Sequence, residues 1–493
     1  MNTFTVMFGS VPKGRKLLPS RWVLRKKFNT NGQVARLKSR LCIRGDRQVP
    51  EMDYFETFAS VVRYSTLRVL LAKAAEEDLE IDHLNVDTAF LNPTVEEDIY
   101  MSVPQFLDQV YTEVKDREDA FLKLNKALYG LKQAPRAWFE MVKKFFKDLG
   151  LCSSDADPNL FIGRGVYILL FVDDMLLVGA KTKVDEVKSA IMKEWKCKDL
   201  KEIDIFVGFQ VIRERKQRTL KIHQTFYTSK LLDRLGMANA NPIKLLILSG
   251  TVLKEDPTFL EEDDITVYRQ IVGSTIYLAN CTRPDISYAV GQLARFMSKP
   301  GELHYKLTKQ LLRYLNGSKH IGITFSGHGT QLPRAYDIHT DSTWGTEEDR
   351  LSFQGMAVVR YGGVVSWMSQ RQKSIALSSL EAEVMAASEG AREAAWFEKL
   401  TADLGERSQT EPFIPTLYCD NQGAVALVHD TKFHARAKHI EIRYLYVRTE
   451  MVHKNRLKVV HIPGTEQVAD IFTKQLEVIK SQRHLKALEL DIE

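Results

Sequence analysis

The sequence predicts a multidomain protein of mixed α and β structure, on three observations. The chain has 493 residues, which at about 100–200 residues per domain allows two to four domains with real cores. Two short apolar runs around Asp173 and Asp174 predict a buried β-hairpin over residues 166–179. From Tyr336 onward, a pattern of strand, strand, helix, strand and helix predicts an α/β sheet in the C-terminal third.

Composition and charge exclude several classes of protein. Hydrophobic residues make up 44% and charged residues 27% of the chain, which are ordinary globular values. They exclude a disordered, collagen-like or coiled-coil protein. The longest apolar run, residues 166–172, is far too short to span a membrane, and residues 1–16 lack a signal-peptide pattern. We therefore expect no membrane partner and an intracellular protein.

The positive charge is concentrated near the N-terminus. Residues 13–47 contain twelve Lys or Arg and a single acidic residue, Asp46. Within this segment two runs that contain apolar residues flank Asn31-Gly32, and Asn-Gly in this setting is a strong hairpin signal. A basic hairpin suits the binding of phosphate groups. The alternative, a merely solvated surface, is less favoured because acidic residues are nearly absent.

Asp173 and Asp174 form the first candidate site. Adjacent carboxylates at the tip of a buried hairpin repel each other and are costly to desolvate, so a bound divalent cation is the expected compensation. The alternative is an ordinary Asp-Asp turn. Such a turn more often contains Gly or Asn and has more polar neighbours, so the residues favour a metal site.

Several motifs resemble one family. Phe171-Val-Asp-Asp174 resembles the catalytic box of reverse transcriptases, which usually reads Tyr-x-Asp-Asp. The block Leu128-Tyr-Gly-Leu-Lys-Gln-Ala-Pro-Arg-Ala-Trp138 is similar to a specific block of Ty1/copia-type retrotransposon Pol polyproteins, as are residues 44–58 and 282–286. The resemblance runs from about residue 11 to 475, in the family's order. It implies an α+β right-hand polymerase of fingers, palm and thumb, followed by an α/β RNase H-like domain with a mixed five-stranded sheet.

Two changes in composition divide the chain. Residues 239–264 combine Asn, Pro, Ser-Gly and an acidic cluster, and residues 326–334 contain two glycines and a proline. We expect fingers and palm in residues 1–240, a thumb or connection region in 241–333, and the RNase H-like domain in 334–480.

The resemblance implies a two-metal polymerase site. In the family, carboxylates hold two cations that activate the primer 3′-hydroxyl and neutralise the triphosphate. Asp173 and Asp174 match the family's metal-binding pair, and residues 206–210 resemble the primer-gripping turn. Four positions match residues around the incoming nucleotide: Lys38 and Arg40 at the triphosphate, Gln133 beside the pocket, and Phe90 under the sugar, where it excludes a 2′-hydroxyl.

One position departs from the family's pattern. The third metal-binding acid usually opens the motif Asp-Val-x-Thr-Ala-Phe, and this chain has Asn85 at that place. An amide offers one neutral oxygen but no bridging charge. Asp87 shares the strand face of Asn85 at about 6–7 Å, too far to substitute, and Asp82 faces the other side. We therefore predict an impaired polymerase site.

The second candidate site consists of four acids in the C-terminal third. Asp341 is expected in a first strand, Glu383 in a helix, Asp420 at the end of a strand, and Asp470 at the start of the last helix. Helix geometry selects Glu383, which lies beside the apolar face, whereas Glu381 is expected to be solvated. This order resembles an RNase H domain. It implies that Asp341, Glu383, Asp420 and Asp470 hold two Mg²⁺ ions that act on RNA in an RNA–DNA hybrid.

We therefore expect a retrotransposon reverse transcriptase with RNase H activity and an impaired polymerase site. Its expected cofactor is Mg²⁺, two ions per active site, and its expected partners are an RNA template, a DNA primer, RNA–DNA hybrid and dNTPs. The alternatives are a degenerate copy that retains only the RNase H activity, or a non-catalytic nucleic-acid-binding relic. We expect a fragment or decayed copy of a longer polyprotein, in the cytoplasm, in the virus-like particle of the family, or in the nucleus.

Overall fold

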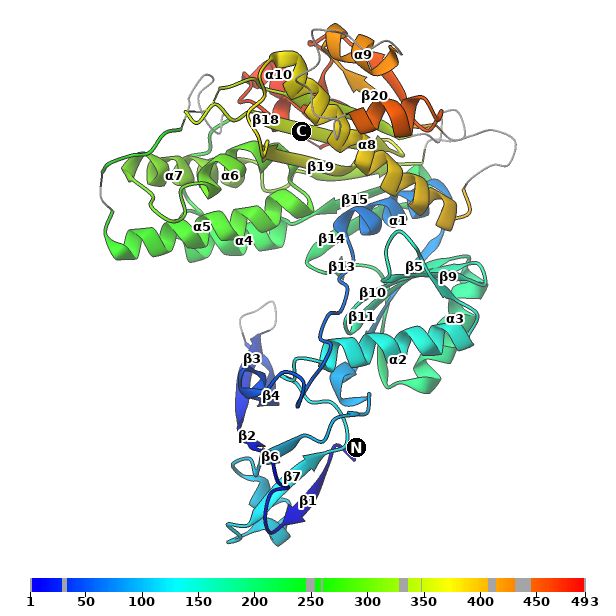
Figure 1. The fold of residues 1–493 in the computed structure, drawn as a ribbon, viewed down its shortest axis with the longest axis vertical. Coiled ribbons are helices and arrows are strands. Elements are labelled where there is room, and N and C mark those ends of the chain that lie inside the picture. Colours follow the sequence, from blue (N-terminus) through cyan, green and yellow to red (C-terminus); the bar gives the residue numbers. More distant parts are fainter. Residues whose placement is uncertain are drawn as a thin grey trace.

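The computed structural model describes residues 2–28, 33–244, 253–258, 260–327, 336–346, 348–406, 414–430 and 445–491. Within this part of the chain the strands form five sheets. Figure 1 shows the N-terminal sheet and ribbon at one end of an elongated molecule, a second sheet in the middle, and the C-terminal sheet with the helices α4 to α7 at the other end.

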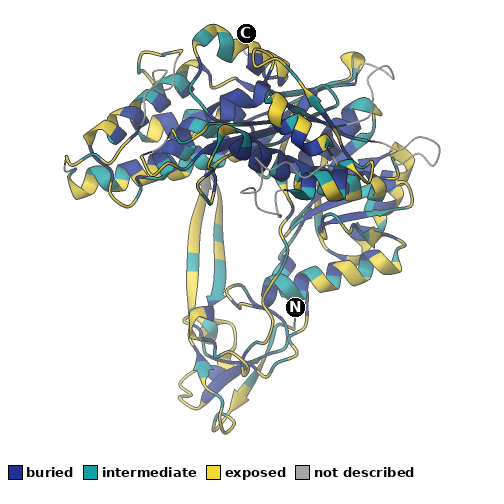
Figure 2. Ribbon diagram, turned by 45° about the horizontal axis from the view of Figure 1, so that its top comes forward, coloured by how far each residue is buried: buried dark blue, intermediate teal, exposed yellow. Residues whose placement is uncertain are grey.

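The N-terminal region combines a small sheet with a two-stranded ribbon. The sheet has the order β1-β7-β6-β2, from Phe4–Phe8, Ala120–Leu124, Tyr100–Ser102 and Leu17–Leu18. The ribbon pairs β3 (Ser20–Phe28) with β4 (Val34–Ile43) in antiparallel register. This pairing confirms the predicted basic hairpin, although the Asn31-Gly32 turn lies outside the described residues. Figure 2 shows the ribbon as largely exposed.

The two faces of the ribbon differ in chemistry. Directly paired residues of antiparallel strands point to the same side, and successive residues alternate. The register therefore places five basic residues on one side of the ribbon, Arg21, Arg25, Arg36, Lys38 and Arg40. The opposite side carries exposed apolar residues, among them Leu24 and Leu37.

The central sheet holds the predicted acidic hairpin. Its order is β12-β5-β11-β10-β9-β8, from Cys197–Glu202, Glu80–Val86, Asp174–Gly179, Val166–Phe171, Leu160–Gly163 and Cys152–Ser153. The antiparallel pair β10–β11 confirms the hairpin. Alternate apolar residues pack α2 (Ala134–Asp148) and α3 (Lys181–Glu194) on one face and α1 (Tyr64–Glu76) on the other.

A third sheet connects the central sheet to a helical region. It has the order β13-β14-β15-β16, from Ile205–Phe206, Phe209–Glu214, Thr219–His223 and Gly322–Ser326. The helices α4 (Thr225–Arg234), α5 (Glu262–Cys281), α6 (Ser287–Ala294) and α7 (Glu302–Gly317) share one apolar core. The division expected near residue 240 stays a prediction. The helix α4 lies before residue 240, but it packs with the helices that come after this residue.

The C-terminal sheet has five strands in the order β19-β18-β17-β20-β21. They span Gly363–Arg371, Phe353–Arg360, Asp337–Ser342, Thr416–Cys419 and Lys458–His461, and alternate with α8 (Ser379–Asp403), α9 (Gln422–His429) and α10 (Val478–Ala487). Parallel and antiparallel pairs both occur, which confirms the expected mixed five-stranded sheet. Two strands were predicted before the first helix of this region, whereas three, β17, β18 and β19, precede α8.

The C-terminal sheet packs directly on the central region. Arg68 of α1 is buried, and its guanidinium donates hydrogen bonds to the carbonyl oxygens of Val365 and Cys281, at 2.7 and 2.9 Å. Lys73 of α1 forms an ion pair of 3.0 Å with the buried carboxylate of Glu406, beyond the end of α8. One continuous apolar core joins the two regions. No helix within the described residues is long and apolar enough to cross a membrane.

Candidate active sites

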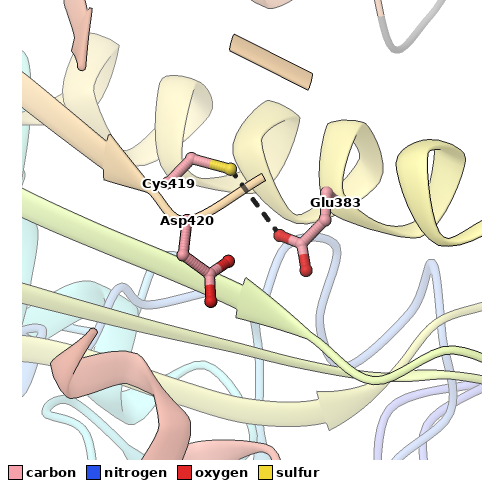
Figure 3. Close-up of side chains that lie close together, drawn as sticks. All are labelled: Glu383, Cys419 and Asp420. Atoms are coloured by element: carbon pink, nitrogen blue, oxygen red, sulfur yellow. Dashed lines mark hydrogen bonds between the residues drawn. The ribbon is translucent and has the colours of Figure 1, made fainter. Parts of the chain in front are cut away.

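The four acids predicted in the C-terminal third lie together at one end of the sheet. Carboxylate oxygens of Asp341, Asp420 and Asp470 all lie within 4.8 Å of one another. Glu383 and Asp420 form a second such group with Cys419. Figure 3 shows Glu383 projecting from α8 toward Asp420 and Cys419, which follow one another at the end of β20. The sequence prediction therefore named four residues that the fold brings together.

The sheet itself brings the acids close. β17 and β20 are parallel neighbours with His339 opposite Tyr418, so Asp341 and Asp420, each two residues further on, come next to each other at the carboxyl ends of their strands. The buried Gln467 side chain donates hydrogen bonds to the carbonyl oxygens of Thr340 and Tyr418, at 2.9 and 3.3 Å. These bonds fix the turn that carries Asp470 across both strands.

A glycine makes room for this turn. Gly355 of β18 lies directly opposite Asp341. A Cβ atom at this position would lie 2.7 Å from Cβ of Phe472 and 2.9 Å from the carbonyl oxygen of Ala469. Only glycine therefore allows the 3-10 turn Val468–Phe472 to approach the sheet. Asp470 lies in this turn and not in the last helix as predicted, because α10 begins only at Val478.

Burial and mutual repulsion dominate the electrostatics of the quartet. Burial, with a further contribution from Asp470, raises the pKa of Asp341 to about 6. Burial and the charges of Asp341 and Asp420 raise the pKa of Glu383 well above its usual range. Burial and the charge of Asp470 also raise the pKa of Asp420. The site thus concentrates negative charge that needs nearby positive charge to remain ionised near neutral pH.

Two lysines provide part of that charge. The ammonium of Lys474 lies 2.7 Å from Oδ1 of Asp470 and 3.8 Å from Oδ2 of Asp341, and Lys480 of α10 lies 2.5 Å from Oδ2 of Asp470. Burial opposes protonation of Lys474, but the charges of Asp341 and Asp470 outweigh it and raise its pKa. The hydroxyl of Thr473 donates a further hydrogen bond to Asp341.

Cys419 is the one thiol next to the quartet among the described residues. Its Sγ lies 3.8 Å from Oε2 of Glu383, as the dashed line in Figure 3 marks. Burial, with the charge of Glu383 adding to it, raises the pKa of this thiol. A thiolate is the form that binds metals, and a raised pKa favours the protonated thiol.

The expectation that Glu381 is solvated was wrong. Glu381 is only 5% exposed, and its carboxylate accepts a hydrogen bond of 2.7 Å from the backbone N–H of Leu377. The hydroxyl of Ser378 in turn accepts from the N–H of Glu381. Ser378 therefore caps the N-terminus of α8, and Glu381 in the first turn ties the preceding loop to the helix that carries Glu383.

Residues 432–439, a basic segment that the resemblance places near the substrate, lie outside the described residues. Two nearby polar residues have internal roles. Ser369 donates a hydrogen bond to the carbonyl oxygen of Phe472, and the buried Gln372 donates one to the carbonyl oxygen of Ala382. Both bonds hold the elements that carry Glu383 and Asp470.

The palm site has a different donor set. Asn85 of β5 pairs in register with Asp174 of β11, and its amide donates a hydrogen bond of 2.9 Å to Oδ1 of Asp174. His83, two residues earlier on the same strand face, lies with Nε2 at 2.8 Å from the same oxygen. The amide thus contributes its N–H and not an oxygen, and two side chains already cover one oxygen of Asp174.

The turn that carries Asp173 is strained. Val172 has a φ of +58°, a left-handed conformation that β-branched residues rarely adopt. The indole N–H of the buried Trp138 donates a hydrogen bond of 2.6 Å to the carbonyl oxygen of Val172. Burial and the charge of Asp174 raise the pKa of Asp173. Backbone strain of this kind collects at functional sites.

The other acids near Asn85 point elsewhere. Asp87 follows the end of β5 and forms an ion pair of 3.4 Å with Lys198. Asp82 faces the opposite side of the sheet, where it pairs at 2.5 Å with Lys188 of α3. Neither is described in contact with Asp173 or Asp174, as expected from the strand geometry.

Of the four residues expected around a nucleotide, Lys38 and Arg40 lie on β4, Phe90 follows β5 and Gln133 directly precedes α2. The charge of Lys38 acts on Asp173, and the guanidinium of Arg40 lies 5.2 Å from the ring centre of Tyr129. Phe90 packs edge-on against the same ring at 5.4 Å. Gln133 is buried, and its amide donates hydrogen bonds to the carbonyl oxygen of Asp53 and to Glu97.

Sequence reasoning missed several residues that shape these sites. His83 could have been found, because it shares the strand parity of Asn85. Lys474 could have been found from its i,i+4 spacing to Asp470. Gln467 and Gly355 carry no local signal, because their roles depend on contacts between segments that are distant in the sequence.

Comparisons with known proteins bear on the family of this chain. A family model described as reverse transcriptase (RNA-dependent DNA polymerase) matches residues 1–249. The chain is 36% identical, over 476 residues, to the retrovirus-related Pol polyprotein from transposon TNT 1-94 of Nicotiana tabacum. This alignment covers 94% of the present chain but only 35% of that protein. The chain is also 32% identical to the putative transposon Ty5-1 protein of Saccharomyces cerevisiae, in an alignment that covers 62% of the present chain and 98% of that protein.

The chain thus spans about a third of the length of the Pol polyproteins that it matches. Among solved structures, a foamy viral protease-reverse transcriptase in complex with double-stranded DNA aligns over 93% of this chain and 66% of that chain, with a TM-score of 0.48 and 10% identity. The sequence relatives confirm the resemblance drawn from the motifs. The chain belongs to the reverse transcriptase (RNA-dependent DNA polymerase) family, in the form found in the Pol polyproteins of transposons.

Proposed function

We propose that this chain carries a metal-dependent nuclease site that cuts RNA within an RNA–DNA hybrid, beside an RNA-directed DNA polymerase site that Asn85 impairs. The observation that supports this best is the contrast between the two donor sets. The C-terminal quartet offers four carboxylates at one end of a sheet. The palm offers two carboxylates and an amide that donates its N–H.

The quartet fits Mg²⁺. Its donors are hard carboxylate oxygens, which Mg²⁺ prefers, and oxygens of Asp341, Asp420 and Asp470 lie within 4.8 Å of one another. We assign the binding of two ions to Asp341, Glu383, Asp420 and Asp470. When bound, the ions would supply a Lewis acid and a water of lowered pKa.

The residues of the chain would do the rest. The carboxylates would hold the ions, and their raised pKa values (about 6 for Asp341) express how strongly the quartet needs positive charge. The turn tied down by Gln467 keeps Asp470 in place, and the helix start, where Ser378 is the cap and Glu381 bonds to the preceding loop, keeps Glu383 in place. In such domains the 2′-hydroxyl of the RNA strand, read across the wide minor groove, selects RNA over DNA.

The palm residues fit a two-metal site poorly. Asp174 already accepts from both Asn85 and His83, and the third carboxylate is missing. This observation favours the alternative in which this copy retains mainly the nuclease, while fingers and palm hold the hybrid. The proposed partners are primed RNA template, RNA–DNA hybrid and dNTPs.

A gel assay with the purified chain tests the proposal. We expect cleavage of the RNA strand of a labelled RNA–DNA hybrid in Mg²⁺, none in EDTA, and none of the same RNA as a single strand. On primed RNA template, dNTP incorporation should be barely detectable. Absence of cleavage at every Mg²⁺ concentration would contradict the nuclease assignment. Rapid dNTP incorporation would contradict the proposal that Asn85 impairs the polymerase site.

Binding of the hybrid is expected to depend steeply on salt, because the basic side of the β3–β4 ribbon presents Arg21, Arg25 and Arg36, all exposed. Each phosphate contact contributes about 0.7–0.9 to the slope of log K against log [salt]. Replacing the three arginines by Gln should therefore reduce the slope by about two. Fluorescence anisotropy over a series of salt concentrations measures it.

A matched triple variant controls for net charge. Lys143, Lys144 and Lys147 are exposed on α2, which covers the face of the central sheet opposite to Asn85 and Asp174. Their replacement by Gln should leave the slope unchanged. Equal slopes for both triple variants would show that the ribbon is not the phosphate-binding surface.

A further inference from the structure

Lys474 occupies a special place in the acid quartet. It stands four residues after Asp470, and its ammonium reaches back to contact Oδ1 of Asp470 at 2.7 Å and Oδ2 of Asp341 at 3.8 Å. Both carboxylates are almost fully buried, at 2% and 3% side-chain exposure, whereas the Lys474 side chain is 43% exposed. The lysine thus enters the site from the surface and bridges two of its acids.

We propose that the Lys474 ammonium is a built-in competitor of one of the two cations, and so sets how much divalent metal the quartet needs. This inference rests on the proposed nuclease site. Mg²⁺ holds carboxylate oxygens at 2.0–2.1 Å. A cation between Asp341 and Asp470 would bind the oxygens that Lys474 contacts, and two positive charges at that spacing repel strongly. Metal binding there requires Lys474 to move outward.

The contact geometry permits that movement. Nζ of Lys474 lies 2.7 Å from Oδ1 of Asp470 but 3.8 Å from Oδ2 of Asp341. Displacement of the ammonium therefore breaks one close contact, which a bound divalent cation would replace with a stronger attraction. The half-exposed stem gives the side chain a route into solvent.

The quartet is also asymmetric. No ion pair within 4.0 Å of Glu383 or Asp420 occurs in the part of the chain that the structure describes, whereas Asp470 has a lysine on each oxygen. The two metal positions therefore differ in kind. A cation on the side of Glu383 and Asp420 meets no ammonium in direct contact with those two carboxylates, although the charge of Lys474 acts on Asp420 from further away, whereas a cation on the side of Asp341 and Asp470 must displace one. We infer one tight and one weak binding step.

Mn²⁺ titration followed by electron paramagnetic resonance measures both steps without any need for activity. The full chain is used with Asp173 and Asp174 both changed to Asn, so that bound Mn²⁺ reports on the quartet. We expect Lys474→Gln to tighten the weaker constant about tenfold or more, the size expected on removing a unit charge about 4 Å from a bound cation. The tighter constant should change less than about threefold.

Two further variants separate displacement from net charge. Lys474→Arg keeps the charge and should keep the weak step weak. Lys480→Gln removes a charge from the other oxygen of Asp470 and has no described contact with Asp341, so it should tighten the weak step much less than Lys474→Gln. Equal effects of Lys474→Gln and Lys480→Gln, or no effect of either, would overturn the inference.

Stability in EDTA provides a second readout. Without Lys474, Asp341 and Asp470 face each other with less compensation, so Lys474→Gln should melt at a lower temperature than the parent in EDTA and regain the difference in Mg²⁺. If the parent binds no Mn²⁺ at all, the proposed nuclease site itself fails. If it binds two ions and Lys474→Gln changes neither constant nor melting, only the role of Lys474 fails.

Discussion

Changing Asn85 to Asp is expected to raise Mg²⁺-dependent dNTP incorporation on primed RNA by two orders of magnitude or more. In the present chain the Asn85 amide donates to Asp174 at 2.9 Å, so the position contributes neither a charge nor a metal ligand. The loss of one positioned electrostatic group in a catalytic site typically costs about 10²–10³ in rate. An anionic ligand restored on β5, opposite Asp174, should recover at least this much. Single-nucleotide incorporation under single-turnover conditions measures it.

Asp87→Asn is the matched control for this prediction. It changes a carboxylate two residues away whose described partners are Lys196 and Lys198, and it should leave incorporation and hybrid cleavage unchanged. If the unmodified chain incorporates dNTPs efficiently and Asp87→Asn abolishes this activity, Asp87 supplies the third ligand. An unchanged rate in Asn85→Asp would mean that another defect, such as the hydrogen bond from His83 to Asp174, limits the palm.

Asp420→Asn is expected to abolish cleavage of the hybrid, with a loss of about 10³-fold or more, while binding stays within about twofold. Asp420 is the acid common to both groups of converging side chains, so its replacement removes a shared charge from the centre of the quartet. Asp420 forms no ion pair within the described residues, so its replacement should not disturb a basic residue that contacts the nucleic acid. Cleavage rates and anisotropy, measured on the same hybrid, separate the two effects.

Folding should not account for this loss. Burial and the charge of Asp470 raise the pKa of Asp420, so its ionised form is less stable in the folded than in the unfolded chain. The ionised carboxylate therefore costs stability above its unfolded pKa, and the neutral amide should melt at an equal or higher temperature in EDTA.

Asp337→Asn, at the opposite end of β17 from Asp341, serves as the control for Asp420→Asn. Burial also raises the pKa of Asp337, but it lies away from the quartet, so this variant should cleave at the parent rate. Vigorous cleavage by Asp420→Asn would contradict the assignment of the site.

Much of both candidate sites follows from local patterns in the sequence. The short apolar runs on either side of Asp173 and Asp174 place that pair at the tip of a hairpin, because the two acids interrupt two segments of strand length. Helix geometry places Glu383 on the side of α8 that meets the sheet. Asn-Gly between basic runs predicts the ribbon of β3 and β4. The substitution at Asn85 is visible from the motif alone.

Only the tertiary structure decided what these residues contact. Asp341 and Asp470 are 129 positions apart, and their proximity depends on the parallel pairing of β17 and β20, on the Gln467 hydrogen bonds across it, and on the space left by Gly355. Glu381 was expected to be solvated but is buried and bonds to Leu377, because its neighbours come from the loop that precedes α8. The contacts of Lys474 with Asp341 and of His83 with Asp174 likewise join separate segments. Local patterns determine which face a side chain occupies, whereas charge compensation depends on which distant segment packs against that face.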